Sequence, residues 1–351
     1  MRAQVVFVLL IAIVACTASR RSQQPRTTPL ALELPAWALV DTSLHANIPY
    51  DNLLTVEGVA LGRALFYEKA LSGDGTLACA SCHVQAFAFS DPLARSRGMS
   101  GAIGQRNAPA IQNLAWDHFF FWDARALSLE LQAFEPVRGH AEMNNSWMEA
   151  CEKLRTMPRY PSLFKAAFGD ERIDSMRIAF ALAQFERTVI SMNSKYDAVV
   201  HERKISFDPS EQRGRGLFFT RAHCVDCHQP PLFNGHDVVN IGLDSVPIDP
   251  GLGGRTHLPW HMGRFKTPSL RNCEVTAPYM HDGRFTTLEQ VVDFYADDVR
   301  TSVPTLDPHM QPWVKGEVRL SKQDRTDLVA FLRTLTDTLF LGDPRFAAPG
   351  R

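Results

Sequence analysis

Two short motifs bring two thiols and an imidazole together at the same spacing. Each motif reads Cys-x-x-Cys-His, and the copies are Cys79-Ala80-Ser81-Cys82-His83 and Cys224-Val225-Asp226-Cys227-His228. This spacing is the attachment signature of c-type haem, in which both thiols bond covalently to the macrocycle and the histidine binds the iron. A zinc site or a redox-active cysteine pair would explain one copy. Two copies favour two haems, with His83 and His228 as the proximal ligands. The internal repeat and the export signal described below support this interpretation.

The motifs lie inside a longer internal repeat. Further stretches match in the same order: Gly62-Arg63-Ala64-Leu65-Phe66 with Gly214-Arg215-Gly216-Leu217-Phe218, Arg106–Asn113 with Lys266–Asn272, and Trp122–Glu130 with His281–Glu289. Matching segments in a shared order indicate a duplication. The sequence therefore predicts two related haem domains, over residues 49–205 and 206–342. The boundary near residues 203–210 carries Asp-Pro and helix-start chemistry.

The ligand on the far side of each iron separates an electron carrier from a catalyst. An iron with two protein ligands transfers electrons, whereas an iron with an open side can bind peroxide or oxygen. The repeat pairs Pro136 with Tyr295, because each lies fourteen residues after the matched pair Trp122 and His281. Tyr295 can offer a phenolate to iron, and Pro136 cannot bind iron at all. The repeat predicts two unequal sites, with a helix-packing role as the alternative for Tyr295.

The elements that position these residues are expected to be mainly α-helical. Helical signals cover residues 171–192, the capping box Thr286-x-x-Glu289 to about Asp298, and the cap Ser321 through Leu335. No segment alternates strictly between apolar and polar residues, so strands should be few. The stretches 84–117 and 229–265 are rich in Gly, Pro, Asp and Asn and predict long loops. Loops of that length are usually functional or held by something other than protein.

The N-terminus is typical of an export signal. Arg2 precedes an apolar run from Val5 to Ala15, which is short for a membrane span but has the length of a signal core. Cys16 follows Ala15 as in a lipoprotein cleavage box, so residues 1–16 are expected to be removed and Cys16 to carry lipid. An ordinary signal peptide with an incidental cysteine is the alternative. Residues 17–48 are expected to form a tether.

Composition excludes several classes. The chain has 351 residues, with 37 Lys plus Arg against 38 Asp plus Glu, and this net charge of −1 argues against a nucleic-acid binder. Hydrophobic residues make up 45 %, which is enough to bury a core. Seven cysteines are too few for a disulfide scaffold. Cys151 and Cys273 lie outside the motifs and are either a disulfide or two buried thiols.

Over residues 50–340 the chain resembles the bacterial di-haem cytochrome c peroxidase/MauG family. Besides both haem motifs, the resemblance rests on Arg106-Asn107-Ala108-Pro109, Phe121-Trp122-Asp123-x-Arg125, Gln132, Pro136, Glu142-Met143 and Thr276-Ala277-Pro278-Tyr279-Met280-His281-Asp282-Gly283. It implies two cytochrome c-like helical domains and two covalently bound haems.

The resemblance also implies a branch within the family. The position of Tyr295 supplies the distal ligand of the second haem, and it is Met in classical peroxidases and Tyr in MauG-like members. Classical peroxidases place a His in the loop after the first motif, whereas residues 84–117 contain none and offer only Met99. Both features point to the MauG-like branch. Ala222 stands where MauG carries a tryptophan before its second motif, so the docking face or exit route should differ, which favours an MbnH-like or an uncharacterised partner.

Roles for individual residues follow from the same resemblance. Glu142 corresponds to the distal acid–base group, Gln132 to the neighbouring pocket amide, and Pro136 to the open side of the first iron. Trp122 corresponds to the tryptophan between the haems, and His281, its repeat partner, is expected to hydrogen-bond at the same interface. A structural Ca²⁺ is implied, held by the Asn107 side chain and by the backbone carbonyls of Thr276 and Pro278.

The resemblance implies an H₂O₂-dependent periplasmic oxidoreductase. Oxidising power would be shared over both haems and passed to a Trp or Tyr of a protein partner. The alternative is a cytochrome c peroxidase that reduces H₂O₂ to water with electrons from a small cytochrome or cupredoxin. A non-catalytic di-haem electron carrier is a third hypothesis, which Pro136 and the missing loop His argue against.

Overall fold

The computed structural model describes residues 27–235 and 237–350. The predicted signal peptide and Cys16 lie outside the described residues. The described chain is mostly helical, with short turns of 3₁₀-helix and one small two-stranded sheet, so the expected fold class is confirmed. Within these residues no helix combines the length and the apolar character that a membrane crossing requires.

Five helices build the N-terminal half: α2 (Val56–Phe66), α3 (Leu129–Arg138), α4 (Trp147–Thr156), α5 (Arg159–Phe168) and α6 (Ser175–Thr188). The sequence predicted the last of these over 171–192. Helices α2 and α6 cross closely at Gly62, where an added Cβ would lie 1.9 Å from the Ala181 carbonyl oxygen and 2.9 Å from the Phe185 Cβ. Only glycine allows this approach, so Gly62 sets the crossing of the helix pair that supports the core.

The C-terminal half repeats this packing with different helices. Its helices are α7 (Lys195–Val200), α8 (Pro209–Phe219), α9 (Leu252–Thr256), α10 (Leu288–Asp293), α11 (Gln311–Val314) and α12 (Lys322–Arg333). Helix α7 precedes the predicted boundary, but its Tyr196 packs in the C-terminal core. At Gly214 of α8 an added Cβ would lie 1.8 Å from the Asp327 carbonyl oxygen and 2.9 Å from the Phe331 Cβ. Gly62 and Gly214 therefore occupy equivalent places, as the sequence repeat predicts.

The caps of the later helices differ slightly from expectation. Ser321 caps α12 as predicted, with Asp324 closing the box. The box of α10 begins one residue later than predicted, at Thr287, and its partner is Gln290. Thr286 also bonds the Gln290 side chain, so neighbouring threonines compete for the same carbonyl oxygen. After α10 the chain continues as a π-helical turn, Phe294–Asp298.

The two long segments predicted as loops are mainly irregular. They contain 3₁₀ turns, helix α9 and strand β1 (Val238–Val239), which pairs antiparallel with β2 (Phe265–Lys266) through Val238 opposite Lys266. Both halves then make the same left-handed turn, at Asn113 and Asn272.

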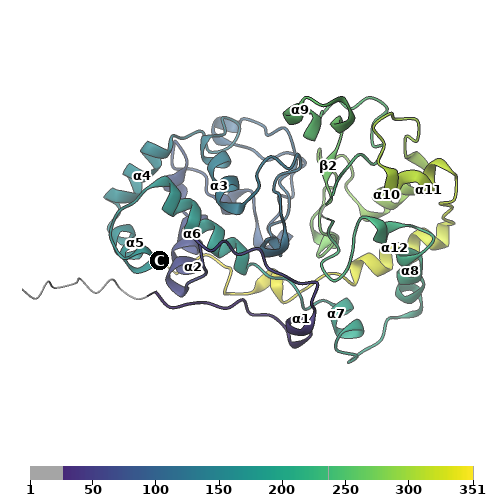
Figure 1. Cartoon of the computed structure of the whole chain (residues 1–351), viewed down its shortest axis with the longest axis horizontal. Helices are drawn as coiled ribbons and strands as arrows, with labels where there is room; N and C mark the ends of the chain where they lie inside the picture. The colour runs from purple at the N-terminus through teal and green to yellow at the C-terminus, as the bar shows by residue number, and fades with distance from the viewer. Residues whose placement is uncertain (1–26, 236, 351) are drawn as a thin grey trace, which may run out of the picture.

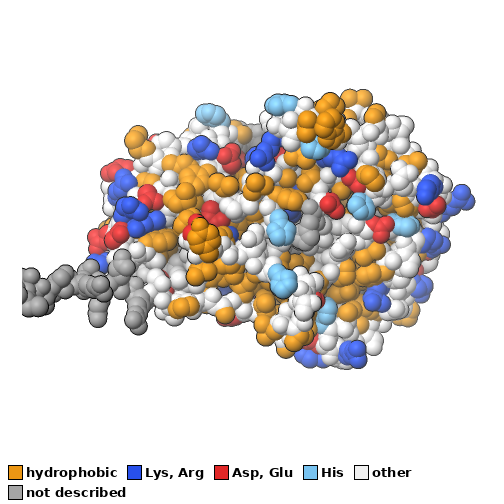
Figure 2. Space-filling model, viewed as in Figure 1, with side chains coloured by type: hydrophobic (Ala, Val, Ile, Leu, Met, Phe, Trp, Pro, Cys, Tyr) orange, Lys and Arg blue, Asp and Glu red, His pale blue; other side chains and the backbone are white. Residues whose placement is uncertain are grey.

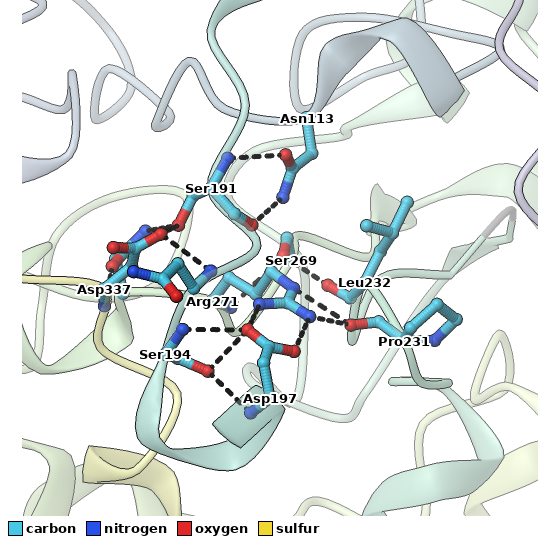
Figure 3. A network of polar contacts seen from close by, with 11 residues as sticks. Asn113, Ser191, Ser194, Asp197, Pro231, Leu232, Ser269, Arg271 and Asp337 are labelled. Atoms are coloured by element: carbon cyan, nitrogen blue, oxygen red, sulfur yellow. Dashed lines mark hydrogen bonds and ion pairs between the residues drawn. The ribbon is translucent and has the colours of Figure 1, made fainter. Parts of the chain in front are cut away.

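A buried polar network joins the halves, because the Gln112 side-chain amide donates to the Arg271 carbonyl oxygen. Arg271 is fully buried and donates to both carboxylate oxygens of Asp197 at 2.8 Å, and to the Pro231 carbonyl oxygen. Figure 3 shows this pair with Ser191, whose hydroxyl donates to Asp337 at 3.1 Å. A buried charge pair with its remaining bonds satisfied fixes geometry, because either charge alone would be costly.

Both chain ends reach across the halves (Figure 1). After α12 the chain returns to the N-terminal half, where Phe340 and Phe346 pack with Phe89 in that core. At the other end, residues 27–48 include α1 (Ala36–Val40), whose Ala38 is buried in a cluster with Trp116. The prediction of a free tether over 17–48 is therefore wrong for its described part, because its apolar residues find a partner surface.

The two remaining cysteines are unpaired. Cys151 is buried in the N-terminal core, and Cys273 is buried in the C-terminal core. Because they belong to different cores, the open choice is resolved in favour of two buried thiols.

Figure 2 shows acidic and basic side chains interspersed on one face, together with scattered hydrophobic groups.

Candidate haem sites

Each half contains a cavity lined by its own Cys-x-x-Cys-His motif. The N-terminal cavity brings together Cys79, Cys82 and His83 with three of the predicted distal residues, Gln132, Pro136 and Glu142. The C-terminal cavity brings together Cys224, Cys227 and His228 with Tyr295. Thiols, an imidazole and an enclosed, largely apolar space are what a covalently attached haem requires. The donor sets of both cavities fit this group.

The two motif histidines are oriented for metal binding by the backbone. His83 Nδ1 lies 2.8 Å from the Phe89 carbonyl oxygen, and His228 Nδ1 lies 3.1 Å from the Pro268 carbonyl oxygen. A carbonyl can only accept, so Nδ1 carries the proton and Nε2 stays free as a ligand. Burial lowers the pKa of His83, and it lowers that of His228 to about 4, which keeps both rings neutral.

Helix α3 presents two predicted residues to the N-terminal cavity. Gln132 and Pro136 are four residues apart, so they lie on the same face of the helix. Proline has no backbone N–H and no side-chain donor atom, so it fills space without offering a ligand. Met99, the soft ligand considered in the preceding loop, does not line this cavity and lies instead beside Gly73. At the position that matches Tyr295, the N-terminal cavity therefore offers no ligand for iron, although His140 and Met143 also line this cavity.

Glu142 lies in the turn that follows α3 and lines the same cavity. Its backbone N–H donates to the Gly139 carbonyl oxygen at 3.0 Å, and its own carbonyl oxygen accepts from the Met99 N–H at 2.8 Å. The side-chain Oε2 is buried and has no hydrogen-bond partner among the described residues. Burial raises the pKa of this carboxyl. A fixed, desolvated carboxyl with a raised pKa is suited to accept and return a proton.

Tyr295 lies in the π-helical turn after α10 and lines the C-terminal cavity. Inserted π turns often occur at functional sites because they redirect a side chain from the regular helical path. Burial raises the pKa of the free phenol. No described residue hydrogen-bonds to the hydroxyl, so this oxygen is available to a metal. Tyr295 and Pro136 thus line the two cavities at matched positions, as the repeat predicts.

Trp122 lines both cavities and lies between them. Its indole N–H donates to the Asn107 carbonyl oxygen at 2.9 Å, and the Asn107 N–H donates to the His281 carbonyl oxygen at 2.8 Å. Asn107 therefore connects the two repeat partners through its backbone. The His281 ring stacks on Phe265 at 3.8 Å, and its Nε2 lies 3.9 Å from an Asp249 carboxylate oxygen. His281 therefore hydrogen-bonds at this interface through its backbone carbonyl, while its ring stacks.

The predicted calcium ligands lie near this junction. Asn107, Thr276 and Pro278 all line the C-terminal cavity. The Asn107 amide nitrogen donates to the Leu93 carbonyl oxygen at 3.0 Å, which leaves its side-chain oxygen free. No described donor contacts that oxygen or the carbonyl oxygens of Thr276 and Pro278. Neutral oxygen donors of this kind fit Ca²⁺. Nowhere in residues 27–235 and 237–350 do three or more His, Cys, Asp or Glu side chains converge as a metal site.

Glu186 is a second carboxyl in the N-terminal cavity, and no motif in the sequence pointed to it. This residue of α6 is 5 % exposed, and burial raises its pKa to about 8. It follows Phe185 directly, just as Leu332 follows Phe331 in the equivalent helix α12. Leu332 lines the C-terminal cavity. One cavity therefore contains a buried acid where the other contains a hydrocarbon side chain.

Comparison with known proteins agrees with this arrangement. A model of the di-haem cytochrome c peroxidase family matches residues 56–204. The chain is 38 % identical over 289 residues to methylamine utilization protein MauG of Methylorubrum extorquens, covering 82 % of this chain and 80 % of that protein. It is 34 % identical over 331 residues to cytochrome-c peroxidase IdrP1 of Pseudomonas sp. (strain SCT), covering 85 % and 86 %.

A solved structure gives the same result. The crystal structure of a MauG-like protein associated with microbial copper homeostasis matches with a TM-score of 0.81 and 34 % identity, covering 92 % of this chain and 100 % of that chain. This coverage extends the similarity over both halves of the chain. This chain is therefore an oxidoreductase that belongs to the di-haem cytochrome c peroxidase/MauG family.

Proposed function

We propose that this protein uses H₂O₂ to oxidise a Trp or Tyr side chain of a partner protein. The observation that carries the proposal is the asymmetry between Pro136 and Tyr295. A cavity without a distal ligand can admit peroxide. A cavity with a phenolate ligand is suited to hold an oxidising equivalent, because a hard anion stabilises oxidised iron.

The two haems, when attached, supply the peroxide-binding site and the store of oxidising equivalents. Around the first, Glu142 takes a proton from the incoming peroxide and returns one to the departing oxygen. Gln132, which lines the same cavity from α3, would hydrogen-bond peroxide there and orient it. Trp122 connects the two cavities, and its hydrogen bond to Asn107 together with the stacked His281 fixes that connection. The overall reduction is H₂O₂ + 2 H⁺ + 2 e⁻ → 2 H₂O.

Addition of H₂O₂ to the ferric protein tests this proposal. We expect a near-infrared charge-resonance band without prior reduction, because one oxidising equivalent is then shared between two sites. Tyr295→Met should leave both haems attached, since attachment depends on the two Cys-x-x-Cys-His motifs, but should abolish the band. Tyr279→Phe is the matched control, because Tyr279 also lines the C-terminal cavity but donates its hydroxyl to the Cys273 carbonyl oxygen. A band of wild-type intensity in Tyr295→Met would exclude Tyr295 as the ligand.

The second candidate is a cytochrome c peroxidase supplied with electrons by a small cytochrome or cupredoxin. The similarity to cytochrome-c peroxidase IdrP1 favours it as much as the similarity to MauG favours the first. A peroxidase of the classical kind requires prior reduction before it reacts. Reaction of the fully ferric protein with H₂O₂ therefore distinguishes the two functions.

The setting of the reaction is part of the proposal. We infer export to the periplasm from the N-terminal apolar run, with a lipid anchor at Cys16.

We also infer a structural Ca²⁺ at Asn107, Thr276 and Pro278, because these residues lie where the two halves meet. Removal of Ca²⁺ by a chelator should change the haem spectrum if the ion fixes this junction, whereas an unchanged spectrum would argue against the site.

A further inference from the structure

Trp313 is a cavity-lining residue that the proposed function leaves unused. The chain has six tryptophans, and the structure describes all of them. Two of the six line the haem cavities: Trp122 lines both, and Trp313 lines only the C-terminal one. Trp313 belongs to α11, which lies beside α10 at the outer edge of the C-terminal half (Figure 1). Trp122 therefore lies between the two cavities, whereas Trp313 belongs to a helix at the outer edge of the C-terminal half.

Trp313 is in direct contact with the predicted iron ligand. Its indole N–H donates to the Tyr295 carbonyl oxygen at 2.6 Å, and the two ring centroids are 6.1 Å apart. The His223 ring centroid lies 6.3 Å from that of Trp313, and His223 directly precedes Cys224, which is expected to attach the haem. The Trp313 indole therefore lies next to the predicted iron ligand and next to the residue that precedes the haem-attachment motif.

The same side chain also reaches the surface. Trp313 is partly exposed, its neighbour Val314 is 46 % exposed, and residues 315–317 of the following turn are exposed. Trp260 offers a contrast, because it is 60 % exposed but lines neither cavity. Trp116 is buried in a separate cluster. Trp122, the other tryptophan that lines this cavity, is also partly exposed but lies between the two cavities, whereas Trp313 lies on α11 next to exposed residues.

We propose that Trp313 is the exit residue through which oxidising equivalents leave the C-terminal site for the protein partner. This inference rests on the proposed function. Trp313 gives one electron toward the cavity and regains one from a Trp or Tyr of the partner placed over α11. Two such transfers supply the two electrons that one H₂O₂ accepts, and the protons released by the oxidised partner side chain go to water.

An indole suits this role better than the neighbouring phenol. Tyr279 also lines the cavity, but its hydroxyl donates to the Cys273 carbonyl oxygen at 2.8 Å. A phenol must lose its proton when it is oxidised at neutral pH, and a peptide carbonyl cannot accept that proton. An indole can lose an electron while keeping its N–H, so the bond from Trp313 to the Tyr295 carbonyl persists through the transfer.

Oxidation of the protein itself in the absence of a partner tests the inference. The di-haem protein is mixed with a small excess of H₂O₂, and oxygen incorporation is located by tandem mass spectrometry, which separates Trp313 from the nearby Met310. We expect Trp313 to be oxidised several-fold more than Trp260, although Trp260 is the more exposed. Freely diffusing oxidants would produce the opposite order. Oxidation that is equal at the two sites, or greater at Trp260 or Tyr279, would overturn the proposal.

Two variants separate electron transfer from hydrogen bonding. Trp313→Phe removes both the indole and its N–H, whereas Trp313→His keeps a ring N–H but is much harder to oxidise. Both should bind two haems, consume H₂O₂ and hold the oxidised state several-fold longer than wild type, because the route outward is lost. Wild-type decay in Trp313→His would show that only the hydrogen bond matters and would overturn the proposal. If the wild-type protein does not consume H₂O₂, both the proposed function and the role of Trp313 are wrong. If it consumes H₂O₂ and Trp313 stays unmodified, only the role of Trp313 is wrong.

Discussion

The two cavities share their attachment chemistry and differ in what faces the attached group. In both, two thiols and a histidine line the space, and a backbone carbonyl accepts from the histidine Nδ1. The N-terminal cavity then has Pro136 and the buried acid Glu186 where the C-terminal cavity has Tyr295 and Leu332. After a duplication, both halves can therefore keep the same helices and the same haem-attachment residues. Substitutions at a few positions then suit one half to react with substrate and the other to store oxidising equivalents.

Substitution of Glu142 should have the largest effect, and that effect is on the rate of reaction with H₂O₂. The proposed proton transfer belongs to the N-terminal cavity alone. Glu142→Gln cannot cycle a proton, so we expect reaction with H₂O₂ to slow by about 10²–10⁴-fold, the usual contribution of a general acid–base group. Both haems and cyanide binding should be retained. Stopped-flow mixing with H₂O₂ measures the rate.

An exposed carboxylate outside the cavity provides the control for this experiment. Glu152 lies on α4, where it pairs with Arg155 at 2.9 Å and does not line the cavity. Glu152→Gln should react at close to the wild-type rate, since exposed substitutions rarely disturb a site. Equal rates for the two variants would remove Glu142 from the proton relay.

A smaller effect, on the free energy of unfolding, tests whether the helix pairs of the two halves are equivalent. Gly62→Ala and Gly214→Ala each place a Cβ within 2 Å of a carbonyl oxygen on the opposing helix. We expect each to lower the free energy of unfolding by about 1–3 kcal/mol, the usual cost of overpacking. Gly216→Ala, in the same helix as Gly214 but facing open space, should instead raise it by up to about 1 kcal/mol. Denaturant titration compares all three, and an unequal response of Gly62 and Gly214 would break the equivalence.

The smallest effect concerns the pH dependence that Glu186 adds to one half only. Its pKa rises from about 4.3 in an unfolded chain to about 8 in the fold. Because the native state binds the extra proton, stability is full below the unfolded value and falls as pH rises toward about 8. The slope should be at most about 1.4 kcal/mol per pH unit.

Glu186→Gln isolates this contribution, because glutamine keeps the shape of the side chain and does not titrate. Urea titrations of wild type and the variant at about pH 5.5 and about pH 7.5 compare the free energies of unfolding across this window. The difference between the two proteins should shift in favour of the variant as pH rises. A difference that is the same at both pH values would show that Glu186 is not protonated in the fold.

Local motifs and the repeat predicted much of this organisation, and tertiary packing accounts for what they missed. The Cys-x-x-Cys-His motifs, the Pro136/Tyr295 pair and the glycines of the helix pairs all carry their information in residue type and spacing. Glu186 lies in an otherwise apolar stretch of α6, and only the packing of α6 on α2 shows that it faces a cavity. The packing of residues 27–48 and the return of Phe340 and Phe346 depend on surfaces distant in sequence, which periodicity does not reveal.

Electron paramagnetic resonance of the ferric protein before any peroxide is added measures the difference between the two sites directly. The asymmetry of Pro136 and Tyr295 predicts one high-spin, five-coordinate haem and one low-spin haem bound by His228 and Tyr295. In Tyr295→Met only the low-spin signal should change, and the high-spin signal should keep its position and intensity. Two low-spin signals with no high-spin component in the wild-type protein would contradict the assignment of an open first site and, with it, the proposed division between the two cavities.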